Sequence, residues 1–308
     1  MKAMAITAYG GPEAMRPMDL DDPKVGPDAV LVRVRAAGVN PVDAKVRAGY
    51  LDAAFPTHFP LIPGWDVAGV VERTGPAVPE FAPGDEVFGY VRKDHIQHGT
   101  YAEYVAAPVR TLARKPATAS FVEAGAIPLA GLTAWQALRV AGVSSGDTVL
   151  VHAAAGGVGT FAVQLARVLG ATVVGTASEG NHDHLRSLGA TPVTYGDGLA
   201  ERVRAAVPGG VSAVLDLVGG DALAVSEAVV EDPRRMVSII DAATALGMGA
   251  RYWFVRPNPS DLVELARLVD TGQLVVHVSG TLPLEDAAEA HRQVETGHGT
   301  GKIVLEVG

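Results

Sequence analysis

Residues 148–178 of this 308-residue chain read TVLVHAAAGGVGTFAVQLARVLGATVVGTAS, and this stretch decides the fold. It opens with an apolar, β-branched run at 149–151, which is typical of a strand buried on both faces of a parallel sheet. A glycine-rich turn and a helical pattern follow, and the helix is predicted to end at Gly170. Residues 172–174 form a second apolar run. Strand, turn, helix and strand in this order predict one βαβ unit.

The glycine-rich turn has the spacing of a dinucleotide-binding fingerprint. The three small-residue positions of G-x-G-x-x-G fall on Ala154, Gly156 and Gly159, so the first position departs from the strict pattern. Gly156 leaves the backbone open to a diphosphate, and Gly159 permits close packing of helix on strand. The helix N-terminus adds unpaired N–H groups and the positive end of its dipole. The turn residues predicted to bind the cofactor are Ala155, Gly156, Gly157, Val158 and Gly159.

The end of the second strand bears on the choice between NADPH and NADH. An Asp or Glu at this position binds the ribose 2′-hydroxyl of NADH. Here residues 175–178 read GTAS, and the missing carboxylate favours NADPH. NADH stays the alternative, because Glu179 follows closely and no Arg or Lys lies between Ser178 and His184. The side chains predicted to hydrogen-bond the ribose end of the cofactor are those of Ser178, Asn181 and His182.

The composition is that of a globular protein with room for about two domains. Hydrophobic residues make up 48% of the chain and charged residues 19%, which is ample material for a core. The net charge of −9 argues against nucleic acid or an anionic membrane as a partner. The absence of cysteine excludes disulfides and thiolate-ligated zinc. Because we find neither a membrane-span pattern nor a signal-peptide core, we expect a cytoplasmic protein.

The pattern changes along the chain. Up to about residue 117, short strands separated by Gly- and Pro-containing turns predict a β-rich domain. Those strands are expected at 3–8, 29–37, 66–72, 86–90 and 101–106. A helix over 131–141 leads into the βαβ unit, a second helix ends at 185–190, and further strands are expected at 193–195, 213–217 and 236–240. Their alternation with helices predicts a doubly wound parallel sheet.

The segment after residue 256 has a different pattern again. Asp261 and Glu264 have the spacing of a capping box, and the helix they open is predicted to end at Gly272. A short strand over 274–278, a helix from Leu284 and a final strand over 302–305 follow. We expect this segment to fold back onto the first domain. The predicted domains are 1–122 plus 256–308, and 123–255.

Seven motifs occur along the chain in the order of a known family. They are AGVNPVD (37–43), PGWDVAG (63–69), GDEVFG (84–89), GTYAEY (99–104), AGLTA (130–134), AAAGGVG (153–159) and GKIVL (301–305). With them the whole chain resembles the medium-chain dehydrogenase/reductase superfamily, in particular its zinc-free, zeta-crystallin-like quinone oxidoreductase branch. The resemblance implies an α/β fold in which a Rossmann domain is inserted into a GroES-like, β-rich catalytic domain. It also implies an active site in the cleft between the domains.

The zinc-dependent members of that superfamily provide a chemical contrast. Where they carry the first zinc-binding cysteine and the His of a G-H-E motif, this sequence has Asn40 and Gly64-Trp65-Asp66. Without a Lewis acid, the alkoxide formed from an ordinary alcohol loses its main stabiliser. Hydride transfer to a quinone or enone gives a phenolate or enolate, for which hydrogen-bond donors suffice. The resemblance therefore implies zinc-independent, NADPH-dependent reduction of quinones or other α,β-unsaturated carbonyls, with no metal site.

The resemblance also suggests catalytic residues, each with a simpler alternative. Asn40 is expected to face the nicotinamide and polarise the substrate carbonyl, with Asp43 as a second candidate. The alternative for both is ordinary turn chemistry beside Pro41. Tyr50 is near the position of a cleft tyrosine in relatives, or else is a surface aromatic. Lys45 stands where many relatives have another tyrosine, which leaves the proton donor open.

Further cofactor contacts follow from the same resemblance. Thr133 matches a threonine that contacts the nicotinamide, or caps a helix. Tyr195 matches a position near the adenosine phosphate, or is a strand-end aromatic. Lys302 matches a G-K motif near the cleft, or is a solvated lysine. Residues at strand ends are expected to wall the cofactor, because ligands bind at the carboxyl ends of such strands: Val218, Gly219, Ser238, Ile239, Phe254 and Val255.

Several alternatives stay open. An enoyl-thioester reductase belongs to the same superfamily, and a protein that binds NADPH with little turnover belongs to a different functional class. The pairs His95/His98 and His182/His184 are interpreted as solvated histidines, and His152 as structural. Relatives are often dimers through edge strands of the Rossmann sheet, so a homodimer is expected.

Overall fold

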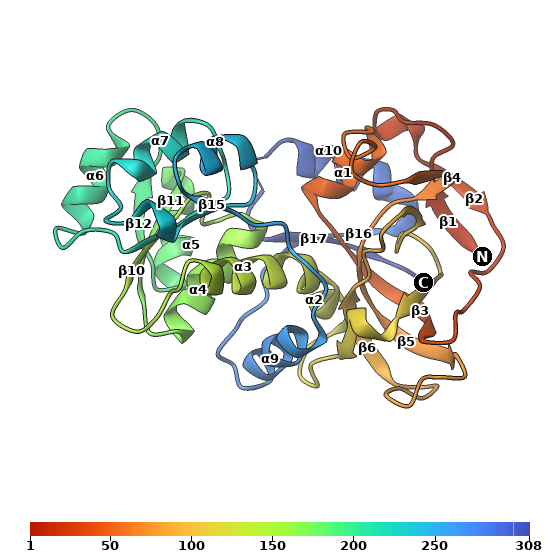
Figure 1. Ribbon diagram of the computed structural model, residues 1–308. Coiled ribbons are helices and arrows are strands. Elements are labelled where there is room, and N and C mark those ends of the chain that lie inside the picture. The colour runs from red at the N-terminus through yellow and green to blue at the C-terminus, as the bar shows by residue number, and fades with distance from the viewer. Residues whose placement is uncertain (298) are drawn as a thin grey trace. The chain divides into compact units, whose positions relative to one another are not determined.

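The computed structural model describes residues 1–297 and 299–308, and the chain forms two compact units (Figure 1). The first unit consists of Met1–Leu129 and Pro257–Gly308, and the second of Ala130–Arg256. These boundaries differ slightly from those expected from the sequence. Residues 123–129 belong to the first unit because helix α2 (Phe121–Ala126) packs on its strands, and Arg256 belongs to the second.

The second unit contains a six-stranded sheet in which all neighbouring strands are parallel. Its strands are β10 (Thr148–Val151), β11 (Thr172–Ala177), β12 (Thr191–Thr194), β13 (Ala213–Asp216), β14 (Met236–Ser238) and β15 (Arg251–Tyr252). Their order across the sheet is β12-β11-β10-β13-β14-β15. This is the order of a dinucleotide-binding fold, and the direction of strand addition reverses between β10 and β13.

Helices follow most of these strands. They are α4 (Gly157–Val168), α5 (His182–Ser187), α6 (Leu199–Ala206), α7 (Asp221–Glu227) and α8 (Ala242–Gly247), with 3₁₀ turns at Glu179–Asn181 and Pro233–Arg235. Helix α3 (Pro128–Val140) precedes β10. Helix α4 packs on β10 and β11, and α8 packs on β14 and β15. The doubly wound sheet predicted from the apolar runs is confirmed. Strand β15 was not predicted, because its two residues carry no apolar run.

The first unit is built on a sheet in the order β16-β17-β3-β5-β6-β9, with β8 also pairing with β3. Strand β17 (Lys302–Glu306) runs antiparallel to β3 (Ala29–Val39), with Ile303 opposite Val39. The C-terminal segment therefore completes this sheet, as the sequence predicts. The other strands are β1 (Lys2–Ala5), β2 (Arg16–Asp19), β4 (Thr57–Ile62), β5 (Asp66–Thr74), β6 (Glu86–Tyr90), β7 (Ile96–His98), β8 (Tyr104–Pro108), β9 (Leu112–Arg114) and β16 (Val278–Pro283).

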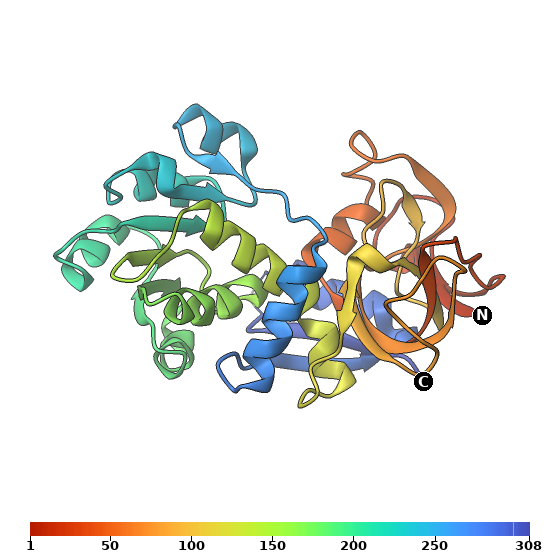
Figure 2. The ribbon, with the colours of Figure 1, turned by 60° about the horizontal axis from the view of Figure 1, so that its bottom comes forward.

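The helices of this unit are α1 (Pro41–Arg47), α2, α9 (Pro259–Asp270) and α10 (Ala287–Glu295), with 3₁₀ turns at Pro12–Ala14, Val109–Thr111 and Leu284–Asp286. Helix α2 lies close on β3 because glycines meet there. A Cβ on Gly38 would stand 2.4 Å from the carbonyl oxygen of Gly125. Helix α9 packs against β9 (Figure 2).

Two predictions for the C-terminal segment are wrong in detail. Helix α9 is capped by Asn258 and not by Asp261, because the Asn258 side-chain oxygen accepts hydrogen bonds from the N–H groups of Ser260 and Asp261, at 3.0 and 3.3 Å. No strand forms over 274–277. The N–H groups of Gln273 and Leu274 donate instead to the carbonyl oxygen of Leu268, at 2.9 and 3.1 Å, so they close the helix.

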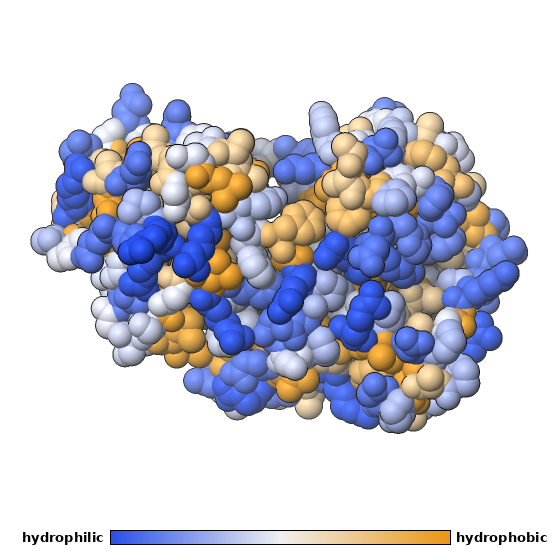
Figure 3. Space-filling view, in the orientation of Figure 1, coloured by the Kyte–Doolittle hydropathy of each residue, from blue (hydrophilic) through white to orange (hydrophobic). Residues whose placement is uncertain are grey.

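In the described part of the chain, no helix combines the length and the apolar character that crossing a membrane requires. Hydrophilic residues predominate on the face of the molecule shown in Figure 3.

A bidentate ion pair joins two loops of the second unit. The guanidinium of Arg235 donates to both carboxylate oxygens of Asp147, at 2.9 and 2.7 Å. It also donates to the carbonyl oxygens of Ala141 and Gly142, at 3.1 and 2.9 Å. Hydrogen bonding from Arg235 is the main cause that lowers the pKa of Asp147 to about 2. The pair ties the loop after α3 to the start of β14.

We expect Arg235→Lys to lower the free energy of unfolding by about 1–2 kcal/mol, because an ammonium cannot replace a forked donor that serves four oxygens. Urea denaturation measures this change. The matched control is Arg234→Lys, since Arg234 has a side chain that is 79% exposed and pairs with Asp232, two residues away in sequence. The control should change stability by less than about 0.5 kcal/mol. Equal effects of both substitutions would contradict the role given to Arg235.

Candidate active site

Two glycines in the turn between β10 and α4 have different roles, because Gly159 is closely packed and Gly156 is not. A Cβ on Gly159 would lie 2.3 Å from the carbonyl oxygen of Ala153 and 2.6 Å from the carbonyl carbon of Ala154. Only glycine therefore lets the helix pack on this turn. A Cβ on Gly156 would meet only the carbonyl oxygen of Ala153, at 3.3 Å, and otherwise points into open space.

This open side suits a diphosphate. Helix α4 is twelve residues long, and its N-cap, Gly156, has no side chain to bond the first N–H groups. Those N–H groups and the positive end of the helix dipole suit an anion. The turn therefore fits the diphosphate of a nicotinamide dinucleotide, with Ala155, Gly157 and Val158 on the same backbone segment.

Apolar side chains are exposed where the parallel strands end. Val218 follows β13 and is 52% exposed, Ile240 follows β14 and is 45% exposed, and Phe254 follows β15. Tyr195, after β12, is also exposed. The predicted wall residues Val218 and Phe254, and Tyr195, which was predicted to lie near the adenosine phosphate, therefore present surface at the edge of the sheet where such folds bind their ligands.

Other predicted cofactor residues are placed differently. Ser238 is fully buried and its hydroxyl donates to the carboxylate of Asp216 at 2.6 Å, so this side chain cannot wall a ligand. Val255 is also buried, and Ile240 is more exposed than the predicted Ile239. Sequence patterns missed these differences because they do not show which way a side chain points just after a strand.

The residues predicted for the ribose end lie after β11. The Asn181 amide donates to the Ser178 hydroxyl at 3.3 Å, and His182 Nε2 lies 3.4 Å from the hydroxyl oxygen of Thr194. All three predicted side chains are partly exposed, and Glu179 is exposed beside them. Thr133 is buried on α3 in the same unit. Their contacts with a cofactor stay predictions.

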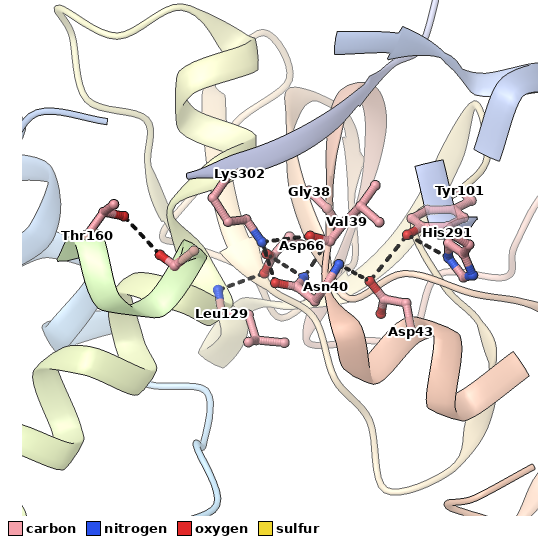
Figure 4. Close-up of polar contacts among 11 residues, drawn as sticks. Gly38, Val39, Asn40, Asp43, Asp66, Tyr101, Leu129, Thr160, His291 and Lys302 are labelled. Atoms are coloured by element: carbon pink, nitrogen blue, oxygen red, sulfur yellow. Dashed lines mark hydrogen bonds and ion pairs between the residues drawn. The ribbon is translucent and has the colours of Figure 1, made fainter. Parts of the chain in front are cut away.

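In the first unit, the predicted catalytic residue Asn40 belongs to a buried polar cluster (Figure 4). Its Nδ2 donates to Asp66 Oδ2 at 2.9 Å, and its Oδ1 accepts a short hydrogen bond from the ammonium of Lys302. That ammonium also donates to the Val39 carbonyl oxygen at 2.9 Å and lies 3.9 Å from Asp66 Oδ2. The N–H of Leu129 donates to the other oxygen of Asp66 at 2.7 Å.

Asp43 connects this cluster to a chain of hydrogen bonds with a single direction. Asp43 Oδ2 accepts from the Asn40 N–H at 2.8 Å and from the Tyr101 hydroxyl at 3.2 Å. Arg47 lies 3.1 Å from His291 Nδ1, and because arginine only donates, Nδ1 is the acceptor. Neutral His291 then carries its proton on Nε2 and donates to the Tyr101 hydroxyl oxygen at 3.2 Å. The order of donation is Arg47, His291, Tyr101, Asp43.

The charges of this network are strongly perturbed. Burial, followed by the nearby charge of Asp66, raises the pKa of Asp43 to about 7. Burial raises the pKa of Asp66 to about 6, although Lys302 opposes the change. Burial also lowers the pKa of Lys302, and burial together with Arg47 lowers the pKa of His291 to about 3. Two carboxyl groups thus share one ammonium, and Asp43 is partly protonated near neutral pH.

The structure brings together some of the predicted catalytic residues and not others. Asn40 and Asp43 are hydrogen-bonded, and Lys302, predicted as a cofactor contact, joins them. Tyr50 is 81% exposed in the turn after α1, as the surface alternative expects. No role could be predicted for Asp66, Tyr101 or Arg47 from the sequence, although Asp66 lies in the PGWDVAG motif and Tyr101 in the GTYAEY motif. His291 carried no signal, because it meets Tyr101 from 190 residues away.

Comparisons with known proteins agree with this architecture. Residues 26–117 match the alcohol dehydrogenase GroES-like domain family, and residues 188–305 match the zinc-binding dehydrogenase family. An NADPH-dependent alkenal/one oxidoreductase of Arabidopsis thaliana, a chloroplastic protein, is 36% identical over 99% of this chain and 79% of its own length. This chain belongs to the medium-chain dehydrogenase/reductase superfamily.

Within the superfamily it belongs to the quinone oxidoreductase branch. The quinone oxidoreductase of Coxiella burnetii superposes on it with a TM-score of 0.90 at 36% identity, over all of this chain and 99% of its own. A mycobacterial protein solved in complex with NADPH superposes with a TM-score of 0.85 at 29% identity, over 99% of this chain and 100% of its own. Among residues 1–297 and 299–308, no three His, Cys, Asp or Glu side chains group together as metal ligands.

The two glycines of the turn allow a paired test of the cofactor site. Gly156→Ala should leave the melting temperature nearly unchanged, because Gly156 has a φ of −73° and its Cβ would meet a single atom. It should weaken NADPH binding by about tenfold or more, because the methyl group stands where the diphosphate approaches. Gly159→Ala should instead lower the free energy of unfolding by about 2–3 kcal/mol. Fluorescence titration and thermal denaturation measure both quantities, and an unchanged NADPH affinity in Gly156→Ala would contradict this site.

A second prediction concerns the pH dependence of stability. The pKa of Asp43 is about 7 in the folded chain and about 3.8 when unfolded, so the folded state binds more protons in this range. The contribution of Asp43 to stability is therefore lost as the pH rises from about 4 through 7. Asp43→Asn imitates the protonated acid, so its stability relative to wild type should rise by about 2 kcal/mol between pH 5 and pH 8.

Urea denaturation at pH 5, 6, 7 and 8 tests this prediction. His152 and His291 have lowered pKa values of about 4 and 3, and they act in the opposite direction below pH 6.5. The difference between variant and wild type cancels their effect. Asp183→Asn, at a side chain that is 97% exposed, is the control and should give a flat difference. A flat difference for Asp43→Asn would show that Asp43 is ionised throughout.

Proposed function

We propose that this protein is a reductase that uses NADPH to transfer hydride to quinones or other α,β-unsaturated carbonyls, and that it works without zinc. The glycine-rich turn, the uncapped start of α4 and the apolar strand ends support the cofactor part of this proposal. The relatives named above, a quinone oxidoreductase and an alkenal/one oxidoreductase, support the substrate class. The missing carboxylate at the end of β11 supports NADPH over NADH.

The observation that carries zinc independence is the position of Lys302. In zinc-dependent members of the superfamily, the position of Asn40 is a metal ligand and that of Asp66 is a nearby Glu. Here one buried ammonium contacts both Asn40 Oδ1 and Asp66 Oδ2. A divalent cation would have to enter beside this positive charge, which is 4% exposed and has little access to screening solvent. The chain's own lysine thus disfavours a metal ion at this place.

For this hydride transfer, the protein needs only to bind the two reactants in position and to donate hydrogen bonds to the reduced substrate. NADPH supplies the hydride, and the reduced substrate carries the negative charge on an enolate or phenolate oxygen. Positioning of the two reactants supplies a large part of the rate. Donors aimed at the developing oxyanion supply the rest.

Asn40 is the donor that the geometry favours. One of its amide hydrogens is held by Asp66 at 2.9 Å, whereas Gly38 O lies at 3.5 Å, which is a weak interaction at best. The second amide hydrogen has only this long contact, and we assign it to the substrate oxygen. Lys302 fixes the orientation of the amide because it binds Oδ1. The positive charge of Lys302 behind the amide strengthens Asn40 as a donor.

A homodimer and a cytoplasmic location remain predictions. Dimers of relatives form through edge strands of the dinucleotide-binding sheet, and β12 and β15 are the edges of this sheet. The size of the purified protein in solution tests the first prediction.

The function is tested with the purified full-length chain in buffer that contains a metal chelator. Loss of nicotinamide absorbance is followed with NADPH or NADH and one of three acceptors, namely a quinone, a short alkenal or an enoyl thioester. We expect turnover of the quinone or the alkenal with NADPH, and an affinity for NADPH about tenfold above that for NADH. Turnover of the enoyl thioester alone would favour an enoyl-thioester reductase instead. Saturable NADPH binding without turnover would indicate a binding protein, and dependence on added zinc would contradict zinc independence.

A further inference from the structure

A buried carboxylate organises the turn that follows β13. Asp216, the last residue of that strand, is fully buried. Its Oδ1 accepts hydrogen bonds from the N–H groups of Val218 and Gly219, at 3.0 and 2.9 Å. The turn it holds has an unusual backbone, since Gly219 and Gly220 have φ values of +82° and +57°. Glycine allows these φ values without steric cost, and the carboxylate selects this backbone path among the many that two glycines could follow.

The same carboxylate also reaches the next strand. Its Oδ2 accepts the hydroxyl proton of Ser238 at 2.6 Å. Since this proton is committed to Asp216, the Ser238 oxygen is left as an acceptor, and it binds the N–H groups of Ile240 and Asp241, at 3.2 and 3.1 Å. One carboxylate and one hydroxyl thus hold four backbone N–H groups in the turns after β13 and β14.

These turns carry the exposed apolar residues of the sheet edge. Val218 and Ile240 are 52% and 45% exposed, whereas the Asp216 and Ser238 side chains behind them are fully buried. Strand β13 is also the neighbour of β10 at the point where the direction of strand addition reverses. Ligands of this fold bind at that point. Asp216 and Ser238, which together form a clamp on these turns, therefore lie directly behind the surface that the proposed function assigns to the cofactor.

A comparable arrangement holds the turn on the other side of that point. The N–H of Ala153, a residue with a φ of +47°, donates to the hydroxyl oxygen of Thr176 at 3.1 Å. The Thr176 hydroxyl lies 3.4 Å from His152 Nδ1, and His152 Nε2 lies 2.8 Å from the hydroxyl oxygen of Ser226. Because Ser226 donates its own proton to Ala222 O at 2.7 Å, it accepts from His152. Buried side chains therefore set the backbone on both sides of the point where the direction of strand addition reverses.

We infer that Asp216 and Ser238 are positioning residues for the cofactor. They do not touch it, and they hold Val218 and Ile240 in the places where these side chains form its wall. This inference rests on the proposed NADPH function. It replaces the contact role that the sequence suggested for Ser238 with a role exerted through the turns.

The chemistry of the clamp makes each member irreplaceable in a different way. Alanine at 238 leaves the N–H groups of Ile240 and Asp241 without their acceptor and removes the donor to Asp216 Oδ2. Asparagine at 216 still accepts from Val218 and Gly219, but its amide nitrogen cannot accept the Ser238 proton. Asp216→Asn is thus the milder change and provides a second variant if Ser238→Ala does not fold.

The experiment compares Ser238→Ala, near the carboxyl ends of the strands, with a matched substitution near the amino ends of the strands of the same sheet. Ser212 lies just before β13, and its hydroxyl oxygen accepts the N–H of Thr148 at 3.1 Å. Ser212→Ala therefore also removes a hydroxyl acceptor for a backbone N–H, at the amino ends of the strands. The quantities measured are the NADPH dissociation constant by fluorescence titration, the melting temperature, and the KM values for NADPH and for a quinone.

We expect Ser238→Ala to raise the dissociation constant and the KM for NADPH by about tenfold, with the quinone KM at saturating NADPH unchanged. Asp216→Asn should raise the same two quantities by at least about threefold. Ser212→Ala should lower the melting temperature while it leaves NADPH affinity within about twofold of wild type.

Three results would overturn the inference. One is a wild-type affinity for NADPH in Ser238→Ala or Asp216→Asn. Another is an equal loss of affinity in Ser212→Ala, which would mean that any loss of stability weakens binding. The third is a rise in quinone KM to the same degree as in NADPH KM. If the wild-type chain itself did not bind NADPH, the proposed function would fail instead, and the two failures are therefore distinguishable.

Discussion

The contacts of the buried Lys302 ammonium with three oxygen atoms are the interaction on which the first unit depends. This ammonium brings β17, at the C-terminal end of the chain, into contact with the carbonyl at the end of β3, the cap of α1 and the first residue of β5. Transfer of a charge into such a place is costly unless oxygen atoms surround it. Here a carbonyl, an amide and a carboxylate do so. Burial and the negative charge of Asp66 nearby raise the pKa of Asp43, so the Asp43 carboxyl can hold a proton within this cluster.

In the second unit, backbone N–H groups just after the strands need hydrogen-bond acceptors, and most of the side chains that provide them are uncharged. A dinucleotide fold needs irregular backbone just after its strands, where no sheet partner can satisfy the N–H groups. Thr176, Asp216 and Ser238 supply acceptors at these places. The surface in front of them stays apolar. Buried polar groups behind an apolar wall combine a fixed backbone with a surface free to pack against a ligand.

Much of the fold could be predicted from the sequence, because the strands of the parallel sheet are continuous apolar runs and the turn of α4 has diagnostic spacing. The C-terminal return to the first unit was also predicted. The prediction of a short strand at 274–278 was wrong, since an apolar residue such as Leu274 can lie at the end of a helix as well as in a strand. In the site, Asn40 and Asp43 were predicted as candidates, but their partners Tyr101 and His291 are distant in sequence. No local pattern records such a pairing.

The division of the chain has a consequence for its synthesis. The second unit, Ala130–Arg256, is continuous, whereas the first begins at Met1 and requires a strand that starts only at Lys302. Translation proceeds from the N-terminus, so the inserted domain can fold on the ribosome while residues 36–39 of β3, which pair with β17 in the finished fold, still lack that partner. These residues acquire their neighbour only when β17 emerges. Until then, the growing chain carries an open strand edge of the kind that chaperones shield from aggregation.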